Sequence, residues 1–145
     1  MKTAIFDIDG TLSNCSARLC HILDGQPDWD AFHSNCHLDP VNEPVLEVLK
    51  KLQKADWTIV LCTGRPWRYG DATKGWLNRH GIVYHNLMMR EDDNKQRDTE
   101  LKRRMLNSLR GLGCDVQMAF EDRQSVVDMW REEGVFCFQC AKGDY

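Results

Sequence analysis

The feature of this sequence that most constrains its fold is an alternation of short apolar runs with amphipathic segments. The apolar runs cover residues 3–8, 56–62, 82–89, 116–120 and 135–140, and turn or charged residues bound them, as is typical of buried strands. The segments between them, about 44–52, 71–80, 98–112 and 124–133, carry apolar residues at helical spacing. Because strands separated by helices need crossover connections, the pattern predicts an α/β fold with three layers, α/β/α, around a mainly parallel sheet.

Local signals mark where several of these elements begin and end. Pro44 suits the first turn of a helix, Asp98 can cap the helix over 98–112, and Gly81 can end the helix before it. Residues 13–42 do not follow the alternation, so we expect a small insert with one or two short helices, around 16–23 and 28–36. The length of 145 residues predicts a single domain over residues 1–145.

Composition and charge exclude several classes of protein. The chain is 42% hydrophobic and 28% charged, which excludes a disordered or fibrous protein. Its formal net charge of −3 means that a nucleic acid must be met by a local basic patch. No apolar run approaches the ~18 residues of a membrane span, and Asp7 and Asp9 interrupt the apolar start of the chain. We therefore expect no membrane contact, a cytoplasmic location, and seven cysteines in the reduced state.

Polar residues follow three of the predicted strands directly. They are Asp7 and Asp9 at the end of the first strand, Thr63, Gly64 and Arg65 after the second, and Glu121, Asp122 and Arg123 after the fourth. The carboxyl ends of parallel strands meet at one edge of a sheet, where ligands bind, so these side chains are expected to converge. A lone Asp-Gly pair is usually a turn, but three such clusters without a function would be a costly accumulation of desolvated charge.

The spacing of Asp7 and Asp9 indicates the chemistry of this site. An extended chain presents residues two positions apart on the same face, so both carboxylates point the same way. Carboxylates this close repel each other unless a hard cation or a shared proton compensates. An oxygen-only ligand set suits Mg²⁺, which binds a few carboxylates and keeps its waters for a phosphate. The sequence therefore predicts a magnesium site next to a phosphate site.

The order of these motifs resembles the signature of a known superfamily. The matching segments are Asp7-Ile8-Asp9-Gly10-Thr11-Leu12, Thr63-Gly64-Arg65, Lys102 and Glu121-Asp122. In this order they are similar to the four motifs of the haloacid dehalogenase (HAD) superfamily of phosphohydrolases. The likeness is closer to the 3′-phosphatase domain of phage-type polynucleotide kinases, because residues 122–131, Cys137-Phe138-Gln139 and Gly143-Asp144-Tyr145 are similar to that family's ending. The resemblance covers nearly the whole chain and implies a HAD-like, Rossmannoid fold with a small or minimal cap insert.

The resemblance also implies roles for the motif residues. Asp7 is implied as the nucleophile that forms an aspartyl-phosphate, and Asp9 as the general acid and base. Mg²⁺ is implied to be held by Asp7, the backbone carbonyl of Asp9, and Asp122. Thr63 is implied to hydrogen-bond the phosphoryl oxygens, and Lys102 to offset their charge.

Three further residues match the polynucleotide-phosphatase pattern, namely Arg18, Arg65 and Asp98. The two guanidinium groups are predicted to bind the substrate phosphate or the nucleotide, and Gly64 belongs to the same substrate-binding motif as Arg65. For Arg18 taken alone, a solvated helix residue is an equally good interpretation. Asp98 can cap its helix, hold Lys102 one helical turn later, or do both.

The chain departs from the family pattern at Glu121, where a second Asp is often found. Glu is one methylene longer, so Asp122 is the better candidate for the metal. A group of cysteine and histidine residues between positions 15 and 37 lacks the paired spacing that is typical of a zinc site.

Two further features near the predicted phosphate site are relevant to nucleic acid. Trp67 lies in the segment 65–69 and can stack on a base there, whereas the other tryptophans are interpreted as core or rim residues. Arg90, Lys95 and Arg97 precede Lys102 and can form a local basic lip.

We therefore expect a Mg²⁺-dependent phosphatase that acts on 3′-phosphate ends of nucleic acid. The insert leaves little room for a large lid, and an open site admits the end of a polymer. No G-x-x-x-x-G-K-[ST] motif occurs, so end repair would require a separate kinase. A phosphatase of free mononucleotides needs the same catalytic set and stays an alternative, as do a receiver-like domain that stores an aspartyl-phosphate and a non-catalytic binding module. The oligomeric state is not predicted.

Overall fold

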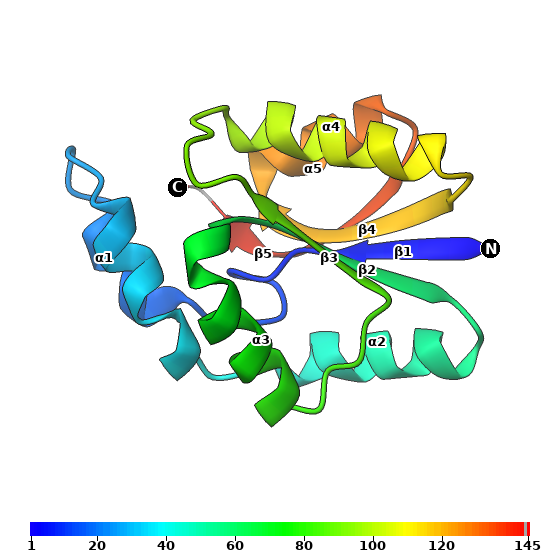
Figure 1. Cartoon of the computed structure of the whole chain (residues 1–145), viewed down its shortest axis with the longest axis horizontal. Coiled ribbons are helices and arrows are strands. Elements are labelled where there is room, and N and C mark those ends of the chain that lie inside the picture. The colour runs from blue at the N-terminus through cyan, green and yellow to red at the C-terminus, as the bar shows by residue number, and fades with distance from the viewer. Residues whose placement is uncertain (144) are drawn as a thin grey trace.

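In the computed structural model, which describes residues 1–143 and 145, the strands form one parallel sheet (Figure 1). Across the sheet these strands follow the order β3-β2-β1-β4-β5, and each pair of neighbours is parallel. Their bounds are β1 (Lys2–Phe6), β2 (Thr58–Pro66), β3 (Asn86–Arg90), β4 (Asp115–Arg123) and β5 (Phe136–Gly143). The prediction of a parallel sheet is confirmed.

Helices cover both faces of the sheet. One face carries α2 (Glu43–Lys54) and α3 (Gly70–Arg79), and the other carries α4 (Asp98–Gly111) and α5 (Gln124–Glu132) (Figure 1). The predicted α/β/α layers are therefore present. Among the described residues, no helix combines the length and the apolar character that crossing a bilayer requires.

Strand periodicity explains why the sheet can be buried on both sides. Ala4 and Phe6 of β1 pack into the core beneath α2 and α3, whereas Ile5 between them packs into the core beneath α4 and α5. Burial of a large side chain such as Phe6 or Ile5 contributes roughly 1.5–3 kcal/mol relative to its exposure. The two cores fix the positions of the carboxyl ends of the strands, and thus of the residues that follow them.

Several element boundaries differ from those predicted. β3 begins only at Asn86, because the register with β2 starts at the pair Val60 and Asn86, although the apolar run already begins at residue 82. At their carboxyl ends β2, β4 and β5 run further than predicted, through irregular registers that pair Pro66 with Arg90 and Arg123 with Gly143. The prolonged strand ends carry the polar motifs.

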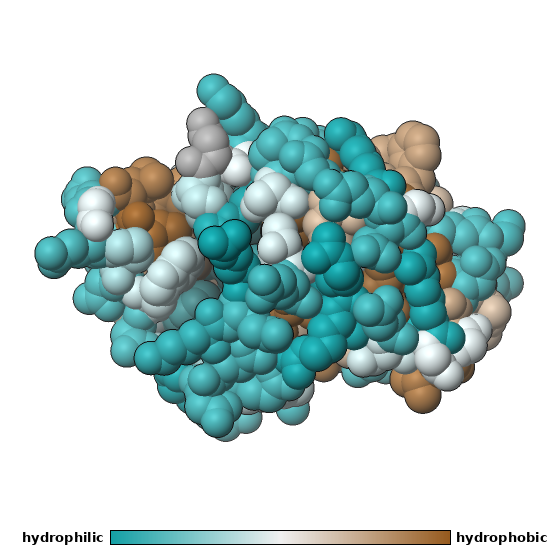
Figure 2. All heavy atoms as spheres, turned by 90° about the horizontal axis from the view of Figure 1, so that it is seen from above, coloured by the Kyte–Doolittle hydropathy of each residue, from teal (hydrophilic) through white to brown (hydrophobic). Residues whose placement is uncertain are grey.

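The insert over residues 13–42 contains α1 (Trp29–Ser34) and two 3₁₀ helices, η1 (Ser16–His21) and η2 (Cys36–Leu38). It lies beyond the carboxyl ends of the strands, and Cys15, Ile22 and Phe32 form a small core of its own (Figure 1). A further 3₁₀ helix, η3 (Trp67–Tyr69), joins β2 to α3. Seen from above, hydrophilic atoms dominate the middle of the face over α4 and α5, and hydrophobic atoms are visible at both ends of the molecule, one of which carries the insert (Figure 2).

Candidate active site

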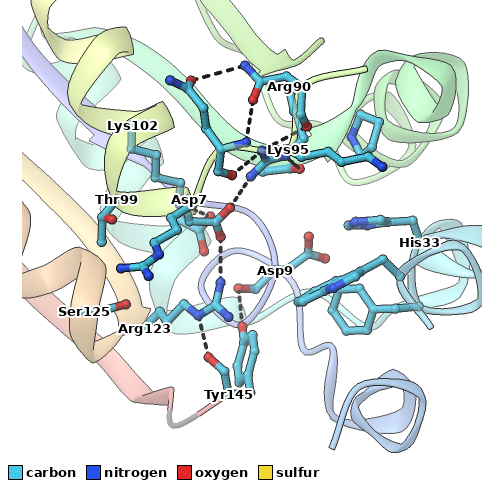
Figure 3. A pocket seen from close by; sticks show the side chains of 18 of the residues that line it. Asp7, Asp9, His33, Arg90, Lys95, Thr99, Lys102, Arg123, Ser125 and Tyr145 are labelled. Atoms are coloured by element: carbon cyan, nitrogen blue, oxygen red, sulfur yellow. Dashed lines mark hydrogen bonds and ion pairs between the residues drawn. The ribbon is translucent and has the colours of Figure 1, made fainter. Parts of the chain in front are cut away.

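A cavity of about 730 Å³ opens at the carboxyl edge of the sheet (Figure 3). Its wall is built from the residues that follow β1, the carboxyl ends of β2 and β4, the loop between β3 and α4, the start of α4, and the insert. Asp7, Asp9, Lys102, Glu121 and Asp122 all line it. Gly64 at the end of β2 lines it as well, whereas Thr63 and Arg65 of the same motif are fully buried and do not.

Asp7 lies at the floor of this cavity, directly after β1. Its backbone N–H donates to the carbonyl of Phe120 at 3.0 Å, which ties it to the end of β4. One carboxylate oxygen accepts from Lys102 Nζ at 2.7 Å, and the other from the hydroxyl of Thr11 at 3.2 Å. Burial, and then the nearby charge of Glu121, raise the pKa of Asp7 to about 7 against the opposing effect of Lys102.

The turn after Asp7 depends on a glycine. Gly10 has a φ of +83°, and a Cβ added there would lie 2.1 Å from Oδ2 of Asp122. The backbone N–H of Gly10 donates to the carbonyl of Ser13, and the N–H of Ser13 returns to the carbonyl of Ile8, which closes the turn. The absence of a side chain at position 10 thus lets the end of β4 approach the end of β1.

Two arginines hold the carboxylate of Asp9. Arg65 donates to it through Nε at 2.9 Å and through Nη2 at 2.7 Å, and Nη2 of Arg18 also donates to it. Burial disfavours the charged form of Asp9, but the charges and hydrogen bonds of Arg65 and Arg18 outweigh this effect and hold its pKa well below its usual range. Asp7 and Asp9 are therefore two carboxyl groups with strongly different acidity in one cavity.

Both arginines are buried and fixed from behind. Arg18 donates to Asp39 through Nε at 2.8 Å and to the carbonyl of Phe32 at 2.6 Å, and Arg65 donates to the hydroxyl of Thr73 at 3.1 Å. Neither is among the residues that line the cavity. That Arg18 and Arg65 bind the substrate phosphate or the nucleotide therefore stays a prediction, and the contacts that the structure shows are those that orient Asp9.

Lys102 joins the acidic residues of β1 and β4. Its ammonium group lies 2.7 Å from Asp7 and 2.7 Å from Oε2 of Glu121, and its side chain is 2% exposed. Oε1 of Glu121 accepts the backbone N–H of Asp122 at 3.1 Å and that of Arg123 at 3.4 Å. Both carboxylate oxygens of Glu121 are therefore engaged. Burial and the charges of Asp7 and Glu121 act in opposite directions on Lys102, and the net effect raises its pKa.

Asp122 has one engaged and one unengaged oxygen. Its Oδ2 accepts from the hydroxyl of Tyr145 at 2.8 Å, and the same hydroxyl lies 3.2 Å from the backbone carbonyl oxygen of Asp9. Its Oδ1 is buried and has no hydrogen-bond partner among the described residues. Burial, and then the charge of Asp7, raise the pKa of Asp122 to about 7.

The carboxylates are close enough to share a cation. Asp7, Glu121 and Asp122 each offer an oxygen, and these oxygens lie within 4.8 Å of one another. Glu121 belongs to this group by distance, but its oxygens are already bonded, whereas Oδ1 of Asp122 is unpaired. A buried carboxylate oxygen without a donor is a costly feature that a hard cation would satisfy, so the donor set fits Mg²⁺.

Asp98 organises the rim of the cavity. It is the first residue of α4 and does not cap it, because the N-cap position is Arg97 and no side chain caps the helix end. The carboxylate of Asp98 instead accepts from Arg90 at 2.5 Å and from Arg123 at 2.8 Å. The predicted cap is therefore wrong. Burial acts to raise the pKa of Asp98, but the charges of Lys102, Arg123 and Arg90 outweigh it, and the pKa is lowered. The side chains that bind Asp98 directly are the two arginines.

Comparison with known proteins places this geometry in a family. Residues 1–145 match the family described as the polynucleotide kinase PNKP phosphatase domain. The chain belongs to this family. It is a HAD phosphohydrolase domain, as the sequence motifs predicted.

The PNKP-type phosphatase domain is similar to several larger proteins. A chain in the "Structure of the Pnkp1/Rnl/Hen1 RNA repair complex" is 32% identical, with a TM-score of 0.84, over 99% of this chain and 43% of that one. A protein of Autographa californica nuclear polyhedrosis virus, named "Putative bifunctional polynucleotide kinase/RNA ligase", is 27% identical over 90% of this chain and 18% of its own length. The domain thus spans less than half of these proteins.

A more distant neighbour shares the fold of this PNKP-type domain. The class C acid phosphatase of Bacillus anthracis, solved with tungstate bound, is 20% identical, with a TM-score of 0.71, over 99% of this chain and 68% of that one. The three-layer architecture is therefore common to phosphatases of different kinds.

The remaining motif residues of the PNKP-type domain lie around the cavity in different ways. Gly64 lines it, and a Cβ added there would lie 2.7 Å from Oδ1 of Asp98. Thr63 is fully buried, and its hydroxyl accepts the backbone N–H of Arg65 at 3.2 Å. Trp67, which was predicted to stack beside the phosphate site, lines a separate cavity between β3 and α4.

Both predicted and unexpected residues complete the lining of the cavity. Arg90, Lys95 and Arg97 line it as the predicted basic lip. Three aromatic side chains of the insert and the C-terminal Tyr145 also line it, although sequence analysis assigned none of them to the site. These three side chains of the insert are Trp29, Phe32 and His33. Their spacing at positions 29, 32 and 33 is the one available signal, because it puts them on one face of a short helix.

Proposed function

We propose that this domain removes the phosphate from 3′ ends of nucleic acid through an aspartyl-phosphate on Asp7. The observation that carries the proposal is the meeting of Asp7, Asp9 and the unpaired oxygen of Asp122 in one cavity with a basic lip. Membership in the PNKP phosphatase family supports the choice of a nucleic-acid end. The lip residues Lys95 and Arg97 suit the phosphates of a chain that continues out of the cavity.

In the first step a carboxylate oxygen of Asp7 attacks phosphorus and forms the Asp7–phosphate bond. The bond from phosphorus to the ribose or deoxyribose oxygen breaks, and that oxygen takes a proton from the carboxyl of Asp9. Arg65 and Arg18 hold Asp9 ionised at rest, so the proton must arrive with the substrate. A phosphomonoester has a second pKa of about 6 and can bring that proton.

In the second step Asp9 acts as the base. Its carboxylate takes a proton from water, the water oxygen attacks phosphorus, and the Asp7–phosphate bond breaks, which releases inorganic phosphate and frees Asp7. The ionised form that Arg65 and Arg18 favour is the form that this step needs. Asp9 is thus protonated in the first step, where it acts as the acid, and ionised in the second step, where it acts as the base.

Lys102 and a bound Mg²⁺ would both offset the negative charge of the transferred group. Lys102, buried between Asp7 and Glu121, stays close to the attacking oxygen and offsets negative charge as the Asp7–phosphate bond forms. Asp7, Asp122 and the backbone carbonyl of Asp9 would hold Mg²⁺. When bound, Mg²⁺ would neutralise charge on the phosphoryl oxygens, so that a phosphate dianion can approach a carboxylate.

The experiment compares substrates under identical conditions. The values of kcat/KM are measured for a 3′-phosphorylated oligonucleotide and for 3′- and 5′-mononucleotides, with and without a chelator. We expect the oligonucleotide to be preferred, chelation to stop hydrolysis, and Asp7→Asn to abolish it. A large preference for mononucleotides would favour the nucleotidase alternative, and a stable phosphoprotein without phosphate release would favour a storage domain.

A further inference from the structure

An exposed indole on the insert forms part of the wall of the catalytic cavity. Trp29 is the first residue of α1 and lines the same cavity as Asp7 and Asp9. Its residue surface is 42% exposed, which is unusual for so large an aromatic side chain. The base of the insert ties this wall to the catalytic centre, because Arg18 donates both to Asp9 and to the carbonyl of Phe32.

The indole of Trp29 is held by two neighbours on the same short helix. The ring of Phe32 meets it edge-on, with centroids 5.6 Å apart at 85°, and the ring of His33 lies 6.1 Å away at 26°. Phe32 is 2% exposed and His33 is 6% exposed, so the ring that faces solvent rests on two buried rings. A flat surface that is supported in this way loses little conformational entropy when a second ring stacks on it.

His33 also connects this aromatic wall to the loop after β2. Its ring lies 5.3 Å from that of Tyr69, and the hydroxyl of Tyr69 donates to Asp30 of α1 at 2.9 Å. Nδ1 of His33 is buried without a hydrogen-bond partner among the described residues. His33 thus lines the cavity with an unsatisfied nitrogen in its ring, on the side opposite Arg123 (Figure 3).

The cavity holds more than a phosphate group. Its volume of about 730 Å³ lies within the range of roughly 300–1,000 Å³ that is typical of sites for larger ligands. Trp29, Phe32 and His33 line it as an aromatic wall. His33 lies on one side of the cavity, and Arg90 and Lys95 of the basic lip lie on another (Figure 3). One wall therefore suits a flat π-system, and the other suits a polyanionic backbone.

We propose that Trp29, supported by Phe32 and His33, is the stacking surface for the base of the nucleotide that carries the scissile phosphate. This inference rests on the proposed function and adds a site for the base to it. Bases of any sequence have a π-face, so stacking on Trp29 selects for a nucleoside without selecting for one base. An oligonucleotide end and a free nucleotide both offer a base and a phosphate to this site. Only the oligonucleotide has further phosphates that the basic lip can contact.

The kinetic test pairs two substrates with two exposed tryptophans. One oligonucleotide carries a 3′-phosphate on a normal terminal nucleotide, and the other carries it on an abasic residue. We expect Trp29→Ala to lower kcat/KM for the first by about tenfold to a hundredfold, the range for one lost base–aromatic stack, and for the abasic substrate far less. Trp29→Phe is expected to keep most of the activity. Trp67→Ala is the matched control, because Trp67 is also 42% exposed but lines the separate cavity.

A binding arm keeps the inference independent of turnover. Two inactive proteins are titrated with a nucleoside 3′-phosphate: the Asp7→Asn variant, and a double variant that carries Asp7→Asn and Trp29→Phe. The difference between their changes in tryptophan fluorescence reports on Trp29. We expect quenching that the double variant loses. Equal losses on the normal and abasic substrates, or no difference in quenching, would overturn the stacking role while leaving the phosphatase proposal intact. Quenching at Trp29 without hydrolysis of any 3′-phosphate would instead contradict the proposed function alone.

Discussion

The hydroxyl of Tyr145 donates a hydrogen bond to Oδ2 of Asp122 at 2.8 Å, while Oδ1 of the same carboxyl group is buried and unpaired among the described residues. The phenol therefore orients Asp122 and leaves one oxygen available. Because the phenol also lies 3.2 Å from the backbone carbonyl of Asp9, a residue at the end of the chain lies between two groups that would hold the metal.

Tyr145→Phe is expected to weaken Mg²⁺ binding by about tenfold, because groups that orient metal ligands typically contribute at least that much to affinity. The measurement is a calorimetric titration with Mg²⁺ of protein from which a chelator has removed any metal and has then itself been removed. Tyr84→Phe, a partly buried tyrosine that packs against the core beneath α2 and α3, is the control. Tighter binding by Tyr145→Phe would mean that the phenol competes with the cation instead of orienting its ligand.

Asp9→Asn is expected to separate the two chemical steps when the substrate is p-nitrophenyl phosphate. Nitrophenolate leaves without a general acid, so Asp7 can still be phosphorylated, but no base remains to activate water. We expect a burst of one equivalent of nitrophenolate and a steady-state rate about 10²–10⁴-fold below that of the wild type. Intact-mass measurement should show one added phosphoryl group. Asp7→Asn should give no burst, and a burst in that variant would exclude Asp7 as the nucleophile.

Gly64→Ala is expected to disturb the rim of the cavity through Asp98. The added Cβ would lie 2.7 Å from Oδ1 of Asp98, which cannot move freely because Arg90 and Arg123 hold the carboxylate. We expect kcat/KM to fall by about tenfold to a hundredfold, as for other small misplacements in active sites. The readout is the steady-state rate on a 3′-phosphorylated oligonucleotide.

Gly75→Ala is the matched control for that substitution. Gly75 lies in the exposed face of α3, and a Cβ there would meet nothing within 4 Å. This variant is expected to be more stable by up to about 1 kcal/mol, because alanine favours a helix over glycine, and to keep its activity. Equal activities for the two glycine variants would refute the role of Asp98 in holding the rim.

The topology was predictable because it follows from local signals. Alternating apolar and amphipathic segments determine the number and order of strands and helices, and the edge rule for parallel sheets then brings the polar strand ends together. Asp7 and Asp122 meet in the structure for this reason, although they are far apart in the sequence.

The partners of individual side chains were harder to predict. Arg18 and Arg65 carry the charge of phosphate ligands, but Asp39 of the insert and Thr73 of α3 hold the two guanidinium groups beside Asp9. Strand and helix periodicity contains no information about such contacts between side chains of different elements. The same holds for Asp98, whose partners Arg90 and Arg123 come from two other elements.

The expected position of Trp67 beside the phosphate site was wrong for a geometric reason. Trp67 is near Arg65 in the sequence, but it begins η3, and its ring lies beneath Lys74 and beside β3, outside the catalytic cavity. Trp29 is far from every motif in the sequence, but the insert folds back over the strand ends and brings it to the cavity wall. Proximity along the chain was therefore a poor guide to proximity at the site.

The raised pKa values of Asp7 and Asp122 predict how the stability of the chelated protein depends on pH. Burial raises both from the ordinary value of 3.8 to about 7, so between these values the folded protein holds protons that the unfolded chain has released. The free energy of unfolding must then fall as the pH rises through this window. His33, whose pKa burial lowers from 6.5 to about 4, acts in the opposite direction, so the wild-type curve alone is ambiguous.

The difference between wild type and Asp122→Asn removes that ambiguity, because His33 is present in both. In chelator, we expect the thermal midpoint of Asp122→Asn to rise relative to that of the wild type between about pH 4 and pH 7, since the variant loses a carboxylate that is unfavourable when ionised. Asp128→Asn, on the exposed face of α5, is the control. Added Mg²⁺ should raise the wild-type midpoint at pH 7 more than that of Asp122→Asn, because the cation compensates the charge that burial penalises. Parallel curves with and without Mg²⁺ would mean that Asp122 neither takes up this proton nor holds the metal.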